Sequence, residues 1–278
     1  MKILLFGRTG WIGYKLYALL KDHEVVVAKS RLDSFCELQK ELENNKDVTH
    51  ILMAAGLTGK PNVDWCEDHK DEVISVNVIG TSIVAKFCYN NDIHFTYLGS
   101  GCIYEYDKEH TYNSKGFTEE DKPNFDGSFY SFTKAMIQDI IKEYNGLILR
   151  LRMPITPDLY PKNFITKITK YKKVINIPNS MSILNDLLPL VPKMMTKELV
   201  GVYNFTNPGV ISHNQILDLY KKYIDKSLTY ENFTIEEQDK ILKAKRSNNC
   251  LDVSKLLNEF SVPHIQESII GVFQQMKH

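Results

Sequence analysis

Near the start of the chain stands Ile3-Leu4-Leu5-Phe6-Gly7-Arg8-Thr9-Gly10-Trp11-Ile12-Gly13, from which the predicted fold follows. It reads as a short apolar strand, a glycine-rich turn and the start of a helix. Glycines spaced GxxGxxG permit a tight bend, a close backbone approach to a phosphate, and close packing of helix on strand. Free N–H groups at the helix start also favour an anion. We therefore predict a dinucleotide site, rather than an ordinary glycine-rich turn, at Gly7, Thr9, Gly10, Trp11, Ile12 and Gly13.

The first half of the chain alternates short apolar runs with longer amphipathic segments. We expect strands at 3–6, 24–28, 50–54, 94–98 and 147–151, and helices at 11–21, 34–44, 71–90 and 128–144. Such alternation predicts βαβ units, hence an α/β fold with a Rossmann-type doubly wound parallel sheet.

From Pro154 onward, prolines break this rhythm, and we expect a strand at 202–206 and helices at 212–224 and 265–276. This half is therefore expected to form a smaller lobe. The predicted division is a cofactor-binding domain at 1–153 and a smaller C-terminal substrate-binding lobe at 154–278, with segments of that lobe returning to the sheet.

Charge and cysteine content exclude several classes of protein. The 34 basic and 34 acidic residues balance, and no basic tract stands out, so nucleic acid is not an expected partner. The five cysteines contain no CxxC, which argues against a disulfide framework and against a metal site. No apolar run approaches the roughly 20 residues that span a bilayer. We expect a cytoplasmic protein without a membrane partner.

The end of the second predicted strand bears on the choice of cofactor. NAD-binding sheets usually carry an acidic residue there, for the ribose hydroxyl. This chain has Ala28-Lys29-Ser30-Arg31 instead. Hydroxyl and cationic groups at Ser30 and Arg31 suit a 2′-phosphate, which favours NADP(H) over NAD(H). The alternative is that these cations are solvated surface charges.

Tyr130 and Lys134 are spaced as YxxxK on a predicted helix, so their side chains share one face. A lysine charge lowers the pKa of a nearby tyrosine and makes it a usable acid. Ser100, just after the fourth predicted strand, could bond the same carbonyl oxygen. A stabilising surface pair is the alternative reading. Together these residues resemble the Ser-Tyr-Lys set of short-chain dehydrogenase/reductases, and Ala54, Ala55, Gly56 and Asn77 match the extended branch of that family.

Cys102 follows Ser100 by two residues, in Gly99-Ser100-Gly101-Cys102-Ile103-Tyr104. A thiol beside a lysine can exchange protons as a thiolate. Carbons next to a ketone are acidic, so Cys102 could act as base or acid in an epimerisation. The alternative is a small buried hydrophobic residue.

Longer strings extend the resemblance over nearly the whole chain, among them 59–67, 101–107, 127–130, 152–155, 163–168, 177–181, 204–209 and 246–249. The chain resembles the epimerase-reductases that make UDP-L-rhamnose in plants and some large DNA viruses. The resemblance implies that Cys102 and Lys167 form the acid/base pair, although Lys167 could also be a surface lysine. This sequence departs from the family pattern at Ser100, where the plant enzymes have threonine, and at Phe132, which replaces a polar residue.

The predicted reaction converts UDP-4-keto-6-deoxy-D-glucose to UDP-β-L-rhamnose with NADPH. Catalysis is assigned to Ser100, Cys102, Tyr130, Lys134 and Lys167. Tyr130, Lys134 and Pro154 are also expected at the cofactor, and the substrate is expected at Thr58, Asn62, Asp64, Trp65, Asn163 and Arg246. Arg246 stands in a charged string and could equally be a surface charge.

The expected partners are a separate 4,6-dehydratase, which supplies the substrate, and a second copy of the chain in a homodimer. Two alternatives stay open. One is a reductase that acts on a dTDP or GDP keto-sugar without epimerisation. The other is a non-catalytic protein that senses NADP(H).

Overall fold

The computed structural model describes residues 1–276, which form two compact units. The first unit comprises Met1–Ile103, Phe125–Arg150 and Leu188–Tyr203; the second comprises Tyr104–Asn124, Leu151–Leu187 and the chain from Asn204 onward. The sequence predicts a division after residue 153. In the structure the units interleave along the chain, because residues 188–203 supply a helix and an edge strand to the first unit.

A six-stranded sheet forms the centre of the first unit, with the strand order β2-β1-β3-β4-β5-β7. The strands are β1 (Lys2–Phe6), β2 (Glu24–Val27), β3 (His50–Met53), β4 (His94–Ser100), β5 (Leu147–Leu151) and β7 (Gly201–Asn204). β1 pairs in parallel with β2 and β3, and β3 pairs in parallel with β4. The predicted α/β class with a parallel sheet is confirmed.

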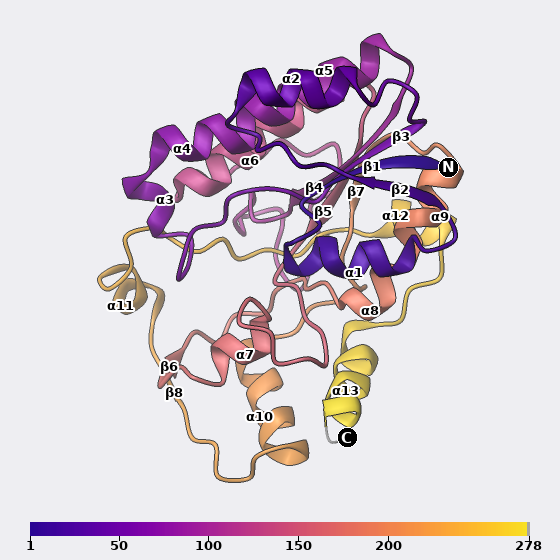
Figure 1. Cartoon of the computed structure of the whole chain (residues 1–278). Helices are drawn as coiled ribbons and strands as arrows, with labels where there is room; N and C mark the ends of the chain where they lie inside the picture. The colour runs from indigo at the N-terminus through magenta and orange to yellow at the C-terminus, as the bar shows by residue number, and fades with distance from the viewer. Residues whose placement is uncertain (277–278) are drawn as a thin grey trace. The chain divides into compact units, whose positions relative to one another are not determined.

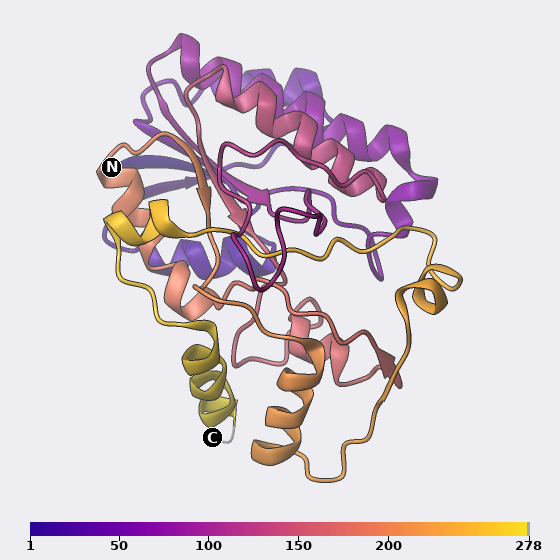
Figure 2. The same ribbon diagram turned by 180° about the vertical axis from the view of Figure 1, so that it is seen from behind.

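Helices cover the sheet on both faces, as Figures 1 and 2 show, with α2, α5 and α6 on one face and α1 on the other. They are α1 (Trp11–Leu19), α2 (Phe35–Glu43), α3 (Trp65–Asp68), α4 (Lys70–Ile74), α5 (Thr81–Asn90), α6 (Phe129–Lys142) and α9 (Leu190–Thr196). The core between sheet and helices includes Leu4, Ile51, Val84, Phe95 and Ile137, none more than 2% exposed. Strands buried on both faces need such continuous apolar runs.

The helical segment Lys70–Asn90 corrects one expectation. It joins α4, a π-helical turn η1 (Ser75–Gly80) and α5, and its 21 residues are long and apolar enough to cross a membrane. The sequence reading that no apolar stretch approaches this length is therefore wrong. Half of the apolar window is buried, and Val73, Val84 and Cys88 are fully buried in the unit. The helix is therefore apolar in the way that a core helix is, because it packs between the sheet and the solvent.

The second unit is built from short elements around its own core. They are α7 (Phe164–Ile168), β6 (Lys173–Val174), α8 (Leu184–Leu187), α10 (His213–Tyr223), β8 (Glu231–Asn232), α11 (Ile235–Asp239), α12 (Ser254–Glu259) and α13 (Ile265–Met276). β6 and β8 form a two-stranded parallel sheet. Tyr220 of α10 packs edge-on against Phe273 of α13, at 5.8 Å between ring centroids. A capping box of Ser212 and Gln215 starts α10 close to its predicted position.

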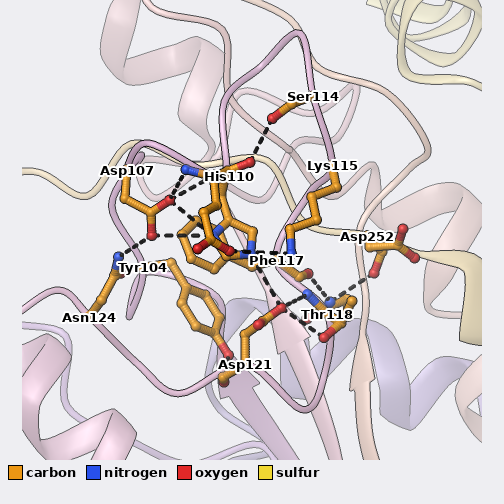
Figure 3. A network of polar contacts seen from close by, with 12 residues as sticks. Tyr104, Asp107, His110, Ser114, Lys115, Phe117, Thr118, Asp121, Asn124 and Asp252 are labelled. Atoms are coloured by element: carbon orange, nitrogen blue, oxygen red, sulfur yellow. Dashed lines mark hydrogen bonds and ion pairs between the residues drawn. The ribbon is translucent and has the colours of Figure 1, made fainter.

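The segment 104–124 of the second unit has little regular structure and is held by polar side chains (Figure 3). The Asp107 carboxylate accepts hydrogen bonds from the backbone N–H groups of Glu109 and His110, at 2.9 and 2.7 Å. The imidazole Nδ1 of His110 lies 3.0 Å from Asp107, and the ring stacks on Phe117 at 4.0 Å. These bonds replace the ladder bonds that the loop lacks.

Replacing Asp107 by Asn should weaken this loop. The pKa of Asp107 lies below its ordinary value, chiefly because the His110 N–H donates to it. A depressed carboxyl pKa contributes stability that is present above about pH 4 and is lost as pH falls through the folded-state value. In urea unfolding, Asp107→Asn should cost about 1 kcal/mol at pH 7. It should also lose less stability than the wild type between pH 5 and 3.

The matched control is Glu109→Gln, because within residues 1–276 that exposed carboxylate approaches a single cation, Lys115, at 3.6 Å. It should leave the urea midpoint unchanged. Equal midpoints for the Asp107 and Glu109 variants would contradict the role given to Asp107.

Candidate active site

The glycine turn after β1 packs directly on the end of β3. Gly7 has a φ of +84°, and a Cβ added there would lie 2.6 Å from the backbone of Ala54 and Ala55. A Cβ added to Gly13 would lie 2.0 Å from the carbonyl oxygen of Gly7. α1 begins after Gly10 without a side-chain cap, so its first N–H groups remain available to an anion. The turn therefore fits a dinucleotide pyrophosphate.

The residues after β2 have carboxylate partners that the sequence reading missed. The N–H groups of Lys29 and Ser30 both donate to Glu41 of α2, at 3.0 Å. The exposed Arg31 guanidinium forms two bonds with Asp33, at 2.9 and 2.7 Å, which raises the pKa of Arg31. The Ser30 hydroxyl is buried and has no hydrogen-bond partner among the described residues. That hydroxyl is available to a bound cofactor.

Asn77 fixes the loop that follows β3. It is 1% exposed and lies in the π-helical turn η1, a local geometry often found at functional sites. Its side-chain oxygen accepts from the N–H of Leu57 at 2.8 Å, and its amide donates to the Leu57 carbonyl at 2.9 Å. A Cβ added to Gly56 would lie 3.4 Å from Asn77 Oδ1 and 3.5 Å from Lys134 Nζ. The structure thus brings Gly56, Asn77 and Lys134 together.

Ser100, Cys102 and Tyr130 meet where β4 ends and α6 begins. Ser100 is the last residue of β4, and its hydroxyl accepts from the N–H of Cys102 at 3.1 Å. Ser128 caps α6 and so places Tyr130 in its first turn. Burial raises the pKa of Tyr130, the nearby Cys102 adds to the rise, and a hydrogen bond with Ser100 opposes it. The expectation that Lys134 lowers the pKa of Tyr130 is therefore wrong, because burial dominates; Tyr130 is a neutral phenol that can donate a proton.

Lys134 lies one turn further along α6, with its ammonium buried. Its Nζ donates to the phenol oxygen of Tyr97 at 2.6 Å. Burial lowers the pKa of Lys134 to about 8, and the Cys66 thiol opposes that fall. Burial raises the pKa of Cys66 to about 11, so this thiol stays neutral. Tyr97 belongs to no motif quoted from the sequence, and Cys66 lies in the 59–67 string without an assigned role; only their place in the fold brings both next to Lys134.

The loop between β3 and α3 carries the predicted sugar-binding residues. The Asn62 side-chain oxygen accepts from the N–H of Asp64 at 2.8 Å. The Trp65 ring stacks on His69, with 3.8 Å between centroids and 9° between planes. Thr58, Asn62, Asp64 and Trp65 are all partly exposed. The loop therefore presents a fixed indole and several polar groups.

The second unit holds the remaining predicted residues. Asn163 caps α7 and is fully buried; its amide donates to the carbonyls of Thr156 and Asp158, and its oxygen accepts from Ile165. These bonds give it a structural role. Pro154 accepts from the N–H of Phe164 at 3.1 Å through its carbonyl.

Lys167 on α7 belongs to a group of cations in the second unit. Burial lowers the pKa of Lys167, and the positive charges of Lys162 and Arg246 lower it further. Lys162 was not predicted from the sequence. An amine with a depressed pKa is a better base near neutral pH.

No group of three or more His, Cys, Asp or Glu residues within 1–276 is placed to hold a metal ion. The groups that the first unit brings together are a hydroxyl, a thiol, a phenol and an amine, at Ser100, Cys102, Tyr130 and Lys134. This set suits proton transfer.

Replacing Gly13 by Ala should separate α1 from the phosphate turn, because the new Cβ would meet the Gly7 backbone at 2.0 Å. We expect the affinity for NADPH, measured by nucleotide fluorescence, to fall at least tenfold, with a loss of stability of about 2–3 kcal/mol. Gly271→Ala is the control, because nothing lies within 4 Å of a Cβ added in α13. Unchanged NADPH binding by Gly13→Ala would place the nucleotide elsewhere.

Known proteins resemble this chain over its whole length. A bifunctional dTDP-4-dehydrorhamnose 3,5-epimerase/dTDP-4-dehydrorhamnose reductase of Arabidopsis thaliana is 50% identical, over 99% of this chain and 93% of that protein. The trifunctional UDP-glucose 4,6-dehydratase/UDP-4-keto-6-deoxy-D-glucose 3,5-epimerase/UDP-4-keto-L-rhamnose-reductase RHM2 of the same plant is 49% identical over 100% of this chain. The chain spans about two fifths of the length of such trifunctional curated relatives, 42% for RHM2.

A solved structure agrees with these sequence matches. The L780 UDP-rhamnose synthase from Acanthamoeba polyphaga mimivirus superimposes with a TM-score of 0.94, at 39% identity, over 99% of both chains. The plant and mimivirus matches confirm the resemblance read from the sequence. Residues 1–277 match the family model described as RmlD substrate binding domain. By this match and by its identity to the bifunctional plant enzyme, the chain belongs to the RmlD substrate binding domain family.

Proposed function

We propose that the chain is a bifunctional nucleotide-sugar 3,5-epimerase/4-reductase that converts UDP-4-keto-6-deoxy-D-glucose to UDP-β-L-rhamnose. One observation carries the proposal: a hydroxyl, a thiol and a phenol gather where β4 ends and α6 begins, at Ser100, Cys102 and Tyr130. A reductase alone needs the hydroxyl and the phenol. The added thiol accounts for the second activity, which the names of the plant relatives also carry.

NADPH is the proposed cofactor. The turn from Gly7 to Gly13 would hold the pyrophosphate of NADPH. The Ser30 hydroxyl, which has no partner among the described residues, would bind the phosphorylated ribose, and Arg31 would bind its 2′-phosphate. Ala54, Ala55, Gly56, Asn77 and Pro154 are proposed to line the rest of the site. Bound NADPH would supply the hydride that C4 of the sugar accepts.

Reduction at C4 needs a proton for the ketone oxygen. Tyr130 donates its phenol proton to that oxygen, and the Ser100 hydroxyl donates a hydrogen bond to it. The Lys134 Nζ lies 5.8 Å from the centroid of the Tyr130 ring, and the proposal gives this ammonium the role of stabilising the phenolate that Tyr130 leaves behind. Solvent then returns the proton to Tyr130.

Epimerisation uses the acidity of C3 and C5, which flank the same ketone. One member of the Cys102–Lys167 pair removes the proton from the carbon, and the electrons pass to the C4 oxygen as an enolate. Ser100 and Tyr130 stabilise that oxyanion by donating hydrogen bonds. The other member returns a proton to the opposite face of the carbon, which inverts it. The depressed pKa of Lys167 supports its part in this exchange.

The sugar nucleotide is proposed to bind through Thr58, Asn62, Asp64 and Trp65 of the loop after β3, and through Arg246. Asn163, which the sequence predicted for the same role, is fully buried and its amide donates to backbone carbonyls, so it is left out of the proposed site. The cation group of Lys162, Lys167 and Arg246 supports an anionic ligand such as a diphosphate. A separate 4,6-dehydratase is proposed to supply the 4-keto-6-deoxy sugar. The trifunctional relatives, whose names include that activity, support this partner.

The proposal is tested with purified protein, NADPH and UDP-4-keto-6-deoxy-D-glucose, with the product identified by NMR. We expect UDP-β-L-rhamnose from the wild type. Cys102→Ser and Lys167→Gln should each reduce its formation at least 100-fold, because each removes a proton-transfer group. Tyr130→Phe should reduce NADPH oxidation by a similar factor. The same assay with NADH and with the dTDP sugar measures the choice of cofactor and of base.

The product distinguishes the alternatives. If wild type and Cys102→Ser equally form a 6-deoxy sugar with unchanged C3 and C5, the protein is a reductase without epimerase activity. The dTDP sugar as the preferred substrate would assign the base named for the bifunctional Arabidopsis relative. No NADPH consumption with either sugar would leave a nucleotide-binding protein without turnover.

We also propose that the chain acts in the cytoplasm and forms a homodimer. All five cysteines are free thiols, as expected in a reducing compartment. Ile79 of η1, Tyr89 of α5, and Phe132 and Met136 of α6 are between 37% and 51% exposed on neighbouring helices. Phe132 thus stands on the outer face of the YxxxK helix. A second copy of this face is the occupant that we propose, because it buries the same apolar residues on both sides.

Light scattering with size-exclusion chromatography tests this dimer. The wild type should have about twice the chain mass of 32.1 kDa. The double change Phe132→Glu and Met136→Glu should yield a monomer, because it places charges in the interface. Ile241→Glu, at a position that is 72% exposed in the second unit, is the control and should remain dimeric. A wild-type monomer would overturn the proposal.

A further inference from the structure

The Lys134 ammonium is buried in the first unit with few polar neighbours. The residue is 6% exposed, and its Nζ donates a 2.6 Å hydrogen bond to the Tyr97 phenol oxygen. No carboxylate of the described chain pairs with this ammonium. A buried charge without compensating contacts tends to neutralise itself. The groups around Nζ therefore decide whether Lys134 is charged near neutral pH.

Tyr97 supplies two contacts that favour the charged form. It lies on β4, in register with Met53 of β3, and is 1% exposed. Nζ lies 4.8 Å from the Tyr97 ring centroid, within cation–π distance. Burial raises the pKa of Tyr97, and the nearby Tyr130 raises it further, so Tyr97 stays a neutral phenol. The phenol oxygen and the ring face of Tyr97 both attract the Lys134 ammonium, and this attraction offsets part of the free-energy cost of burying the charge.

Other groups near Lys134 act differently. Cys66 of α3 raises the pKa of the lysine, but burial raises the pKa of the thiol itself to about 11 and so keeps it neutral. The Tyr130 ring of α6 is farther away, at 5.8 Å. Glu67 accepts from the N–H of Phe129, and Lys70 lies over the Phe129 ring. Among the described residues, it is Tyr97 whose side chain accepts a hydrogen bond from Nζ.

We propose that Tyr97 is a positioning residue of this active site, whose phenol oxygen holds the Lys134 ammonium charged and aimed beside Tyr130. Tyr97 itself touches no reacting atom and acts through Lys134. The inference rests on the proposed reductase function, in which Tyr130 gives up a proton while Lys134 carries its charge.

Tyr97→Phe tests the role, because it keeps the ring and removes the oxygen. Reduction requires charged Lys134, whose pKa of about 8 predicts that kcat falls as pH rises through 8. Without the acceptor the lysine loses its proton more easily, so this alkaline limb should move down by about one pH unit. The rate should fall up to tenfold above pH 8 and remain close to the wild type at pH 6.

Two further variants make the test specific. Tyr97→Met also removes the ring face, so its alkaline limb should lie lower than that of Tyr97→Phe. Tyr106→Phe removes a phenol from the second unit, where Tyr106 donates to the Pro178 carbonyl at 2.8 Å, and its pH profile should match the wild type. The graded order of wild type, Phe and Met keeps the test informative if one variant is unstable.

The outcomes separate this inference from the proposed function. Absence of NADPH-dependent reduction in the wild type would overturn the function and with it the role of Tyr97. An active wild type, together with a Tyr97→Phe variant whose rate falls equally at every pH, would show that Tyr97 only fills space. A limb displaced in Tyr97→Phe and Tyr106→Phe alike would also contradict the specific role.

Discussion

The close backbone contact between the glycine turn and the sheet is the constraint on which the first unit depends. Carbonyl and amide groups of Gly7, Ala54 and Ala55 lie where side chains would otherwise stand. This contact lets α1 start directly above the strand ends and leaves its first N–H groups free. The same approach sets the end of β3 beside the turn, so that the loop carrying Gly56 can reach Lys134. A single methyl group at Gly13 would break this arrangement.

Buried polar side chains then hold the irregular segments in place. Asn77 binds both backbone groups of Leu57, and Asn163 binds three backbone groups around the start of α7. Buried Asn204 donates to the carbonyls of Phe117 and Asp252 in the second unit. Loops without strand or helix bonds need such partners, because an unsatisfied buried backbone group is costly. The asparagine side chains therefore satisfy the backbone groups of the loops, as hydrogen bonds between strands satisfy those of the sheet.

The chemistry of the first unit depends on which of its buried side chains are neutral and which are charged. Tyr130 is kept neutral by burial, Lys134 is buried without a carboxylate among residues 1–276, and Cys66 is held as a thiol. An acid and an ammonium of this kind can exchange protons with a bound ketone, because neither is locked in an ion pair. Cys102, in contrast, is partly exposed, which leaves its thiol accessible. The two thiols therefore differ in burial, and it is the more accessible one to which the proposed function gives a chemical role.

The sequence alone was sufficient to predict the parallel sheet, because alternating apolar runs and amphipathic segments permit few other folds. It also determined the family, through long strings rather than through short motifs such as YxxxK. Tertiary structure alone decided that residues 188–203 are the segment that joins the first unit, that Glu41 accepts hydrogen bonds from the N–H groups after β2, and that Tyr97 accepts a hydrogen bond from the Lys134 ammonium. These facts depend on contacts between residues far apart in the chain, and no local pattern encodes a contact that forms only when the sheet has closed over its helices.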